Sequence, residues 1–399
     1  MQEEKFPYID RLDETVLDEA ILRFGTPTYV FDVEQAKKRA RAFRGIIGQA
    51  ADLCYAMKAN PFLVRAMAEE VNRIEVCSMG EFRICKQKEI PAEKLLISGV
   101  MKDRDDLWEI LETYGNRCHY TIESLNQYAI LNEWARSSGK KVPVYLRLTS
   151  GNQFGMDEET LTNIVELEQD KDLLEICGIH YFSGTQKKRK KTLEELTYLD
   201  EVFARLKEKT GYQVTELEYG PGLAVPYFAR QADERFETLE AIADALAKMQ
   251  WQGKVTLEMG RAFVADCGYY ITTVKDTKRS GDQNYCIIDG GMHQVNYDGQ
   301  IRGMYQPKLT IRPQGARGIY QNWTICGELC TGNDILVQNI KIDDLRVGST
   351  IIFENTGAYA VTEGMALFLS HVLPAVVLYD PVGGFTQVRV RRETYVWNS

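Results

Sequence analysis

Lys58 is the side chain whose position in the sequence most clearly suggests chemistry. It follows residues 53–57, an apolar run that predicts a buried parallel strand, and Ala59, Asn60 and Pro61 end that run. A lysine at the carboxyl end of such a strand can lose its proton by desolvation and form a Schiff base with an aldehyde. The same position also suits a lysine that ends a strand and extends to water, so both interpretations stay open from this stretch alone.

Other polar residues also stand at or just past the ends of apolar runs. They are Ser78, Glu81, Arg147, His180, Gly220 and Glu258. In a closed β/α barrel the carboxyl ends of all strands share one rim, and barrel enzymes build their sites there. Single polar residues often end strands, but so many at one rim predict a functional site.

The order of the runs predicts the elements that hold these residues. From residue 28 to about residue 259, short apolar segments alternate with longer charged segments of helical periodicity, which is typical of β-α units. There is one run more than a (β/α)8 barrel needs, and we assign residues 28–32 to a lead-in strand outside the barrel. After Gly268 the runs are short and separated by Gly, Asn and Asp, which predicts an antiparallel β domain. We therefore expect an α/β protein with a lead-in segment at 1–27 that packs with the β domain, a barrel at 28–268 and the β domain at 269–399.

Composition limits the partners and the location. The chain of 399 residues has a formal net charge of -9, which argues against a general nucleic-acid or membrane binder. Its first residues lack an apolar signal core, and its longest apolar run, at 365–379, is interrupted by polar residues and a proline. We expect a cytoplasmic protein. The cysteines have no CxxC spacing and no histidine pairs with another at ligand spacing, so we expect reduced thiols and no metal site.

Several strings occur in an order that is specific to one family. They are YAMKAN at 55–60, GIHYFSGTQ at 178–186, EYGPGLAVPY at 218–227, EMGR at 258–261, CGELCTGND at 326–334 and GAY at 357–359. Together they resemble the barrel-type (fold type III) pyridoxal-phosphate decarboxylases that act on diaminopimelate and ornithine, which have an alanine racemase-like architecture. The resemblance covers nearly the whole chain. The GTQ, AVPYF and DGGMH strings are most similar to a branch that decarboxylates glutamate held on a carrier protein.

The resemblance implies that Lys58 carries pyridoxal 5'-phosphate covalently and that Glu258 faces the pyridine nitrogen of this cofactor. A carboxylate there keeps the nitrogen protonated and makes the ring a better acceptor for the electrons left by CO2 loss. A salt bridge at the rim is the alternative for Glu258. Racemases on the related barrel place an arginine against this nitrogen, so Glu258 favours decarboxylation.

The resemblance also implies a set of residues that bind the cofactor phosphate. They are Thr185, Gly220, Gly222, Gly260, Arg261 and Tyr359. Backbone N–H groups can approach a phosphate closely at glycines that lead into a helix. The family has three glycines in this turn, whereas the middle one here is Pro221, which has no N–H. One phosphate contact is thus missing or supplied by a neighbour.

Phe182 marks a second departure from the family. Family members usually have a histidine at this position, which stacks on the cofactor ring. A phenyl ring can still stack, but it cannot form a hydrogen bond or share a proton. His180, the first histidine of this motif, is interpreted as a packed barrel residue rather than a catalyst.

Residues in the second half are expected to complete the site across a two-fold homodimer. By the resemblance, Cys330 returns a proton to Cα after CO2 leaves, and Thr331 and Asp334 of the same motif contact the substrate. A buried small hydrophobe is the alternative for Cys330. The family's acid after this cysteine is replaced here by Thr331, which makes a cationic substrate tail less favoured.

Arg302 and Tyr305 resemble the family's arginine and tyrosine that hold a distal carboxylate, which suggests an acidic or acyl-linked substrate side chain. Arg302 could equally be a surface residue. The run KKRKK at 187–191 directly follows the predicted phosphate loop. It is either a solvated approach to a helix or a docking site for an acidic carrier protein.

We therefore predict a homodimeric pyridoxal-phosphate-dependent decarboxylase, a carboxy-lyase of biosynthetic or secondary metabolism. Its substrate is expected to be a small-molecule amino acid or an aminoacyl group on an acyl-carrier protein. The alternatives are a diaminopimelate decarboxylase, an amino-acid racemase on the same fold, and a non-catalytic decarboxylase-like regulator. Glu258 opposes the racemase. Phe182 and Pro221 suggest the regulator, but the presence of Lys58 and Cys330 opposes it.

Overall fold

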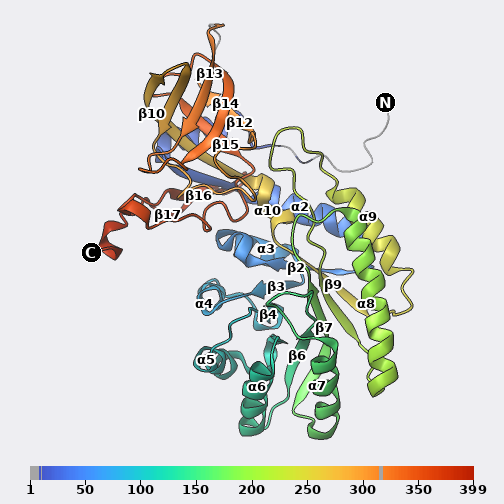
Figure 1. Ribbon diagram of the computed structural model, residues 1–399. Helices are drawn as coiled ribbons and strands as arrows, with labels where there is room; N and C mark the ends of the chain where they lie inside the picture. Colours follow the sequence, from blue (N-terminus) through green and yellow to red (C-terminus); the bar gives the residue numbers. More distant parts are fainter. Residues whose placement is uncertain (1–8, 10, 314–317) are drawn as a thin grey trace. The chain divides into compact units, whose positions relative to one another are not determined.

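The computed structural model (Figure 1) describes residue 9 and residues 11–313 and 318–399. The chain divides into two compact units. The first, which we call the sheet unit, contains Met1–Arg39, Val225–Asp233 and Phe263–Ser399. The second, which we call the barrel unit, contains Ala40–Ala224 and Glu234–Ala262.

The barrel unit holds a closed barrel of parallel strands that follow one another in sequence order. The strands are β2 (Asp52–Ala56), β3 (Arg73–Val76), β4 (Leu95–Ile97), β5 (His119–Ile122), β6 (Val142–Arg147), β7 (Leu174–Phe182), β8 (Glu216–Gly220) and β9 (Lys254–Met259). β9 closes the barrel by pairing in parallel with β2. The strands are apolar because both faces are covered, and all residues of β6 are buried.

Helices alternate with these strands, as Figure 1 shows. The α-helices among the described residues are α1 (Glu14–Phe24), α2 (Val33–Ile47), α3 (Val64–Glu70), α4 (Met79–Gln87), α5 (Arg104–Tyr114), α6 (Leu125–Ser138), α7 (Glu158–Lys171), α8 (Arg189–Thr210), α9 (Arg235–Leu246) and α10 (Arg261–Val264). Short 3-10 helices are η1 (Met57–Ala59), η2 (Pro61–Leu63), η3 (Ala92–Lys94), η4 (Gly115–Arg117), η5 (Ala265–Cys267), η6 (Phe368–Ser370) and η7 (Tyr395–Trp397). Several helices begin at a side chain that accepts a backbone N–H, such as Ser78, Ser124 and Asp157. These capping side chains therefore determine where the helices begin.

The described part of the sheet unit forms a nine-stranded sheet. Its strands are β1 (Thr28–Asp32), β10 (Gly268–Ser280), β11 (Gln283–Ile288), β12 (Leu309–Arg312), β13 (Tyr320–Cys326), β14 (Ile335–Asp343), β15 (Thr350–Glu354), β16 (Ala375–Asp380) and β17 (Gly384–Arg389). The main path runs β14-β13-β11-β10-β1-β16-β17, and β15 pairs with both β10 and β12. Most pairs are antiparallel, but β1 pairs in parallel with β16 and β11 with β13. The sheet is therefore mixed rather than purely antiparallel, because long connections allow parallel pairing.

β1 belongs to the sheet and lies outside the barrel. It pairs antiparallel with β10 and parallel with β16. α1 packs beside it, and Leu12, Leu17 and Val30 share one hydrophobic cluster with Ile271. The compact units therefore divide the chain differently from the expected ranges 1–27, 28–268 and 269–399, since β1 and Val225–Asp233 belong with the sheet unit.

Among the described residues, no helix combines the length and the apolar character that crossing a bilayer requires.

Candidate active site

Lys58 lies at the carboxyl end of β2, in the short helix η1. The side chains on either side of it, Met57 and Ala59, are buried, whereas the Lys58 side chain is 35% exposed. The turn behind it is held by the Tyr55 hydroxyl, which donates to the Asn60 carbonyl at 2.9 Å. Backbone geometry therefore directs one amine out of a buried strand end, as the sequence predicts.

Glu75 of β3 forms an ion pair with the Lys58 amine. Lys58 Nζ lies 3.0 Å from Oε2 and 3.2 Å from Oε1 of this buried carboxylate. Ser98 donates to Oε1 at 2.5 Å and the Cys77 thiol donates to it at 2.8 Å. Burial alone raises the pKa of Glu75, but Lys58 and these donors outweigh it and hold the pKa below its usual range. Glu75 is thus a fixed anion that orients the amine.

Cys77 acts here as a neutral donor. Burial, with the negative charge of Glu75 as a further cause, raises the pKa of the Cys77 thiol well above its usual value. Its sulfur lies 3.6 Å from Lys58 Nζ. A protonated thiol can keep its hydrogen bond to Glu75 over the ordinary pH range.

Phe182 lies at the end of β7, within the same rim. Its ring centroid is 5.9 Å from Lys58 Nζ. A Cβ at Gly220 would lie 2.4 Å from Phe182 Cδ2, so the absence of a side chain at Gly220 makes room for the ring. The aromatic residue that replaces the family's histidine therefore sits beside the amine.

Glu258 lies on β9 and is buried with its partner His180 of β7. His180 Nε2 is 2.9 Å from Glu258 Oε2, and the two side chains are 1% and 4% exposed. Within the described structure His180 Nδ1 has no hydrogen-bond partner. His180 is thus buried, as the sequence predicts, and its imidazole also contacts the predicted catalytic carboxylate.

Glycines allow close backbone contacts between the strand ends that carry Lys58 and Glu258. A Cβ at Gly260 would lie 2.8 Å from the Ala59 Cβ and 2.9 Å from the Ala56 carbonyl oxygen. The chain that follows Glu258 is thus in contact with the segment that carries Lys58. No other residue type could approach so closely at this point.

The turn after β8 packs on the turn after β7. Gly222 has a φ of 60°, and a Cβ there would lie 2.2 Å from the Gly184 carbonyl oxygen. Lys187 N donates to the Gly222 carbonyl at 2.9 Å, and Lys187 Nζ donates to the Gly220 carbonyl at 3.2 Å. Thr185 is exposed beside this turn. The paired turns form a glycine-lined cradle of the kind that accommodates a phosphate.

Lys187 differs from the rest of the KKRKK run. Its side chain is 8% exposed, and its amine contacts Glu195 Oε2 at 2.5 Å. Burial lowers the pKa of Lys187. The next four cations, residues 188–191, are exposed. The first lysine of the run is therefore part of the cradle. The two interpretations of the run, as exposed residues that lead into a helix or as a docking site, apply only to the other four cations.

The barrel interior also holds a buried ion pair between Arg73 and Glu218. Arg73 Nη1 lies 2.5 Å from Glu218 Oε2 and 2.9 Å from the Tyr145 hydroxyl. Burial raises the pKa of Glu218 in spite of the neighbouring Arg73. This network places polar groups inside the barrel, with Arg73 paired to Glu218 and Tyr145.

The residues at the ends of β2, β7, β8 and β9 fit pyridoxal 5'-phosphate. They offer an amine for its aldehyde, an aromatic ring for its face, a buried carboxylate for its nitrogen and a glycine cradle for its phosphate. Arg261 begins α10, directly after Gly260. The barrel unit alone therefore contains most of the predicted cofactor-binding residues.

Cys330, Thr331 and Asp334 lie in the sheet unit, on the loop between β13 and β14. Cys330 is exposed. Asp334 is buried, and its two carboxylate oxygens accept from Met292 N at 2.8 Å and Leu329 N at 2.9 Å. Asp334 therefore shapes the loop that carries Cys330. The substrate-binding role of Asp334 and Thr331 stays a prediction, as does the catalytic role of Cys330.

Arg302, Tyr305 and Tyr359 also belong to the sheet unit. Arg302 is exposed and lines a cavity of about 210 Å³ with residues that include Tyr297 and Asn333. The Tyr305 ring lies 5.0 Å from the Phe228 ring, at 30°. Tyr359 has a φ of 63°. Their predicted contacts with substrate and phosphate stay predictions.

The chain matches the family model described as pyridoxal-dependent decarboxylase, pyridoxal binding domain, over residues 33–265. It therefore belongs to the pyridoxal-dependent decarboxylases, and its cofactor is pyridoxal 5'-phosphate. The predictions of a (β/α)8 barrel with a β domain, of the cofactor and of a carboxy-lyase are confirmed.

Comparison with individual proteins shows which members of the family are similar to this chain. The chain is 26% identical to the L-glutamyl-[BtrI acyl-carrier protein] decarboxylase of Niallia circulans over 394 residues, which cover 92% of both proteins. It is 27% identical to the diaminopimelate decarboxylase of Aquifex aeolicus, with 88% of each covered. Its fold matches the crystal structure of diaminopimelate decarboxylase from M. jannaschii in complex with L-lysine, with a TM-score of 0.84, 23% identity, and coverage of 94% of this chain and 92% of that one.

Proposed function

We propose that this enzyme removes the α-carboxylate of an acidic aminoacyl group, such as glutamyl, held on a carrier protein. The observation that carries the proposal is the exposed cationic run at residues 188–191. It follows directly on Lys187, which contacts the Gly220 turn of the cofactor site. The similarity to a decarboxylase of a carrier-bound glutamyl group supports the same conclusion.

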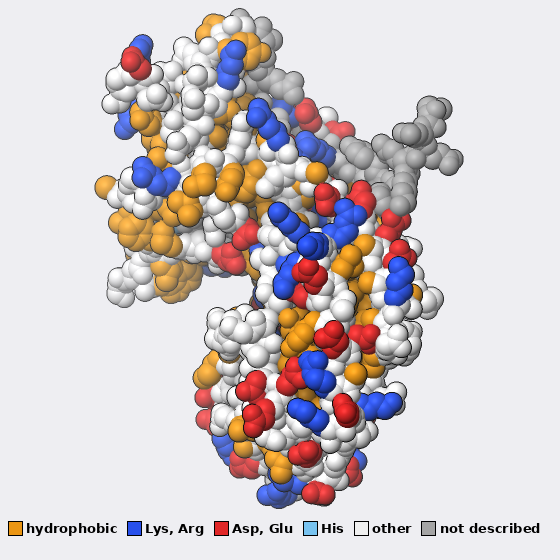
Figure 2. Space-filling model, turned by 45° about the vertical axis from the view of Figure 1, so that its right-hand side comes forward, with side chains coloured by type: hydrophobic (Ala, Val, Ile, Leu, Met, Phe, Trp, Pro, Cys, Tyr) orange, Lys and Arg blue, Asp and Glu red, His pale blue; other side chains and the backbone are white. Residues whose placement is uncertain are grey.

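The cationic run lies where a carrier could reach it. Residues 189–191 begin α8, and Figure 2, which turns the α8 side of Figure 1 forward, shows lysine and arginine side chains grouped on this face among acidic ones. Arg189 and Lys190 lie 3.6 Å and 3.7 Å from single acids, Glu234 and Glu194. Exposed pairs of this kind are weak and exchange readily for another anion. A protein with a formal net charge of -9 thus offers one dense group of cations to an acidic partner.

Lys191 also lines a surface hollow of about 390 Å³. The hollow is bordered by Thr149, Ser150 and Tyr181. These side chains offer hydroxyl groups to a polar tether. A carrier bound at the cationic run would have this hollow beside it.

Residues of this chain share the chemical work. Pyridoxal 5'-phosphate supplies the electron sink for the electron pair that CO2 leaves behind. Lys58 holds the cofactor, Glu75 orients the Lys58 amine, and Glu258 with His180 holds a proton at the ring nitrogen. Cys330, contributed across a homodimer interface, returns a proton to Cα.

Two residues of the sheet unit support the proposed substrate preference: Thr331 on the loop after β13, and Arg302 between β11 and β12. Thr331 replaces the acid that would attract a cationic tail, and Arg302 offers a cation for a distal carboxylate. Both features favour glutamyl over diaminopimelate, ornithine or lysine. They also disfavour a diaminopimelate decarboxylase as the alternative.

The test compares CO2 release from a glutamyl-loaded carrier protein and from free glutamate. Neutralising the run, with K188Q, R189Q, K190Q and K191Q together, is expected to lower kcat/KM for the tethered substrate by roughly tenfold or more and to leave free glutamate unaffected. The matched control is K207Q with K209Q, which removes exposed cations from the last turn of the same helix. Equal losses on both substrates would overturn the docking role. Faster CO2 release from diaminopimelate, ornithine or lysine than from tethered glutamyl would overturn the proposed substrate.

A further inference from the structure

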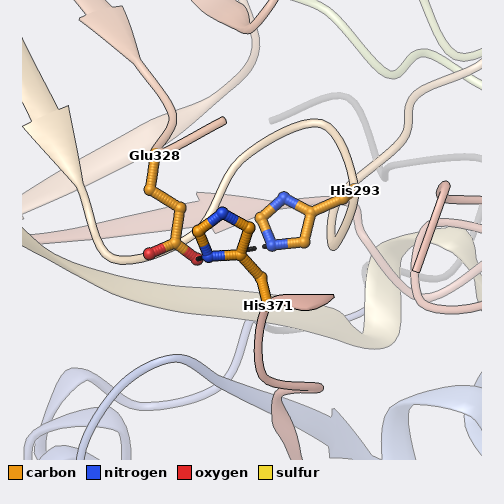
Figure 3. Close-up of side chains that lie close together, drawn as sticks. All are labelled: His293, Glu328 and His371. Atoms are coloured by element: carbon orange, nitrogen blue, oxygen red, sulfur yellow. Dashed lines mark ion pairs between the residues drawn. The ribbon is translucent and has the colours of Figure 1, made fainter. Parts of the chain in front are cut away.

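Three side chains far apart in the sequence converge in the sheet unit, outside the residues assigned to catalysis. His293 follows β11, Glu328 follows β13 and His371 follows η6. Figure 3 shows the two imidazole rings and the carboxylate directed toward one another. Two of the four histidines of the chain are thus brought together with an acid.

The distances in this cluster suit a metal ion. Glu328 Oε1 lies 3.4 Å from His293 Nε2 and 3.2 Å from His371 Nδ1, and the three ligand atoms all lie within 4.8 Å of one another. Zn²⁺ binds imidazole nitrogen and carboxylate oxygen at about 2.0–2.2 Å, so ligand atoms at two corners of a zinc tetrahedron are about 3.3 Å apart. Both measured separations from Glu328 are close to this edge.

The state of His293 is an independent observation that points to a ligand. Its side chain is 1% exposed, and neither ring nitrogen has a hydrogen-bond partner in the described structure. A buried polar group without a partner is costly, and each such group calls for an explanation. A bound cation would satisfy Nε2, the nitrogen directed at Glu328.

Hydrogen bonds to backbone N–H groups hold the loops of His293 and Glu328 in place. The Asp334 carboxylate bridges them, because it accepts from Met292 N and from Leu329 N. Glu328 N also donates to the Gly290 carbonyl at 2.8 Å. Two of the ligands are therefore positioned before any ion arrives.

Further contacts hold the segment of His371. Gln294 Nε2 donates to the Val372 carbonyl at 2.8 Å, which ties the residue after His293 to the residue after His371. The Thr394 hydroxyl donates to the His371 carbonyl at 2.7 Å. The His371 and Glu328 side chains are 27% and 30% exposed, so an ion has access from their side of the cluster.

We propose that His293, Glu328 and His371 form a binding site for one Zn²⁺, with the remaining coordination position open to water. Two imidazoles and one carboxylate are ligands that Zn²⁺ prefers. The ion would join the segments after β11, β13 and η6. This site is distinct from the predicted cofactor residues and does not depend on the substrate of the enzyme.

The test uses the cofactor-loaded enzyme, freed of metal by dialysis against a chelator and then titrated with Zn²⁺ by calorimetry. We expect one equivalent per chain and a rise in Tm on binding. E328Q and H371Q are expected to weaken binding at least about tenfold and to lose most of the Tm shift. Both side chains are partly exposed, so we expect both variants to fold, and circular dichroism checks this.

Matched controls separate this site from other zinc ligands. E393Q removes an exposed carboxylate and H119Q removes a histidine of the barrel unit, and both are expected to bind Zn²⁺ like the unsubstituted enzyme. C330S tests binding by the exposed thiol and is expected to leave the equivalent intact. Absence of stoichiometric binding, or binding that E328Q and H371Q leave unchanged, would overturn the proposal. Loss of the equivalent in C330S would also overturn it.

Discussion

At the scale of single residues, Glu75 explains how an amine at a barrel rim is kept in one orientation. Its carboxylate is buried, contacts Lys58 through both oxygens and accepts hydrogen bonds from Ser98 and Cys77. An ionised group that is so fully paired is stable although it is buried. The Lys58 side chain can therefore be held ready for a cofactor without losing its anchor.

The pairing of Glu75 predicts a pH-dependent contribution to stability. The pKa of Glu75 in the folded chain lies below its ordinary value near 4.5, so its ionised form stabilises the fold above that pH, and the contribution is lost as the pH falls toward the lower folded-state value. We expect E75Q to lower the free energy of unfolding at neutral pH, and the difference from the unsubstituted enzyme to shrink below about pH 4. Urea unfolding at a series of pH values measures this difference.

Glu81 provides the matched control for that series. Burial raises the pKa of Glu81 in the folded chain, so its linkage has the opposite sign and its ionisation destabilises the fold as the pH rises. The E81Q difference is therefore expected to change with pH in the other direction. An E75Q difference that does not vary with pH would show that Glu75 is not the ionised partner of Lys58.

Sequence reasoning found residues at strand ends more readily than residues within strands. Lys58 and Glu258 were predicted because each lies at the end of an apolar run, whereas Phe182 was predicted from its place in the family motif. Glu75 was missed because it lies inside an apolar run, although a charged residue between Ile74 and Val76 was a signal that it has a buried partner. The contact of His180 with Glu258 could not be predicted, because it depends on the pairing of β7, β8 and β9 around the barrel.

At the scale of elements, the turns after β7 and β8 are held against each other by the absence of a side chain at Gly222. Its φ of 60° is unfavourable for other residues, and a Cβ would lie 2.2 Å from the Gly184 carbonyl oxygen. G222A is expected to separate the two turns and to lower the affinity for pyridoxal 5'-phosphate by roughly tenfold or more, since phosphate contacts carry much of such binding. Absorbance titration of the cofactor-free enzyme measures the affinity.

A substitution at Gly211 is the control that separates the effect of backbone strain from the effect of losing the glycine cradle. It ends α8 with a φ of 74°, and a Cβ there would meet no atom within 4 Å. G211A is therefore expected to cost about 1–2 kcal/mol of stability through strain alone and to keep the affinity for the cofactor. Equal affinities for G222A and the unsubstituted enzyme would contradict the role of the glycine cradle.

The barrel strands were predictable because each is a local apolar run that alternates with a charged segment of helical periodicity. The mixed order of the sheet was not, since the parallel pairs β1/β16 and β11/β13 join segments that are distant in the chain. The convergence of His293 with His371 has the same origin. No local spacing encodes it, because it arises only when the loops after β11 and η6 are brought together.

At the scale of the whole molecule, a homodimer with shared sites makes a distinct prediction. If Lys58 of one subunit works with Cys330 of the other, K58A and C330A are each inactive, but a mixed dimer contains one intact site. Random exchange makes half of the dimers mixed, so about a quarter of the activity is expected to return. CO2 release after mixing and reassociation measures the recovery.

A mixture that stays inactive, although size-exclusion chromatography shows mixed dimers, would place both residues in the same subunit's site. The control is a mixture of K58A with E258Q, which share one barrel unit. In that mixed dimer one subunit lacks Lys58 and the other lacks Glu258. Neither barrel unit therefore contains both residues. No recovery is therefore expected from this pair.

The central claim is that the amine of Lys58 carries the cofactor. Lys102 serves as the comparison lysine, because it lies in the same barrel unit and burial lowers its pKa to about 8. Borohydride reduction of the cofactor-loaded enzyme, followed by digestion and mass spectrometry, decides between them. We expect the reduced pyridoxyl adduct on the peptide that contains Lys58, and an adduct on Lys102 or no adduct at all would contradict the account.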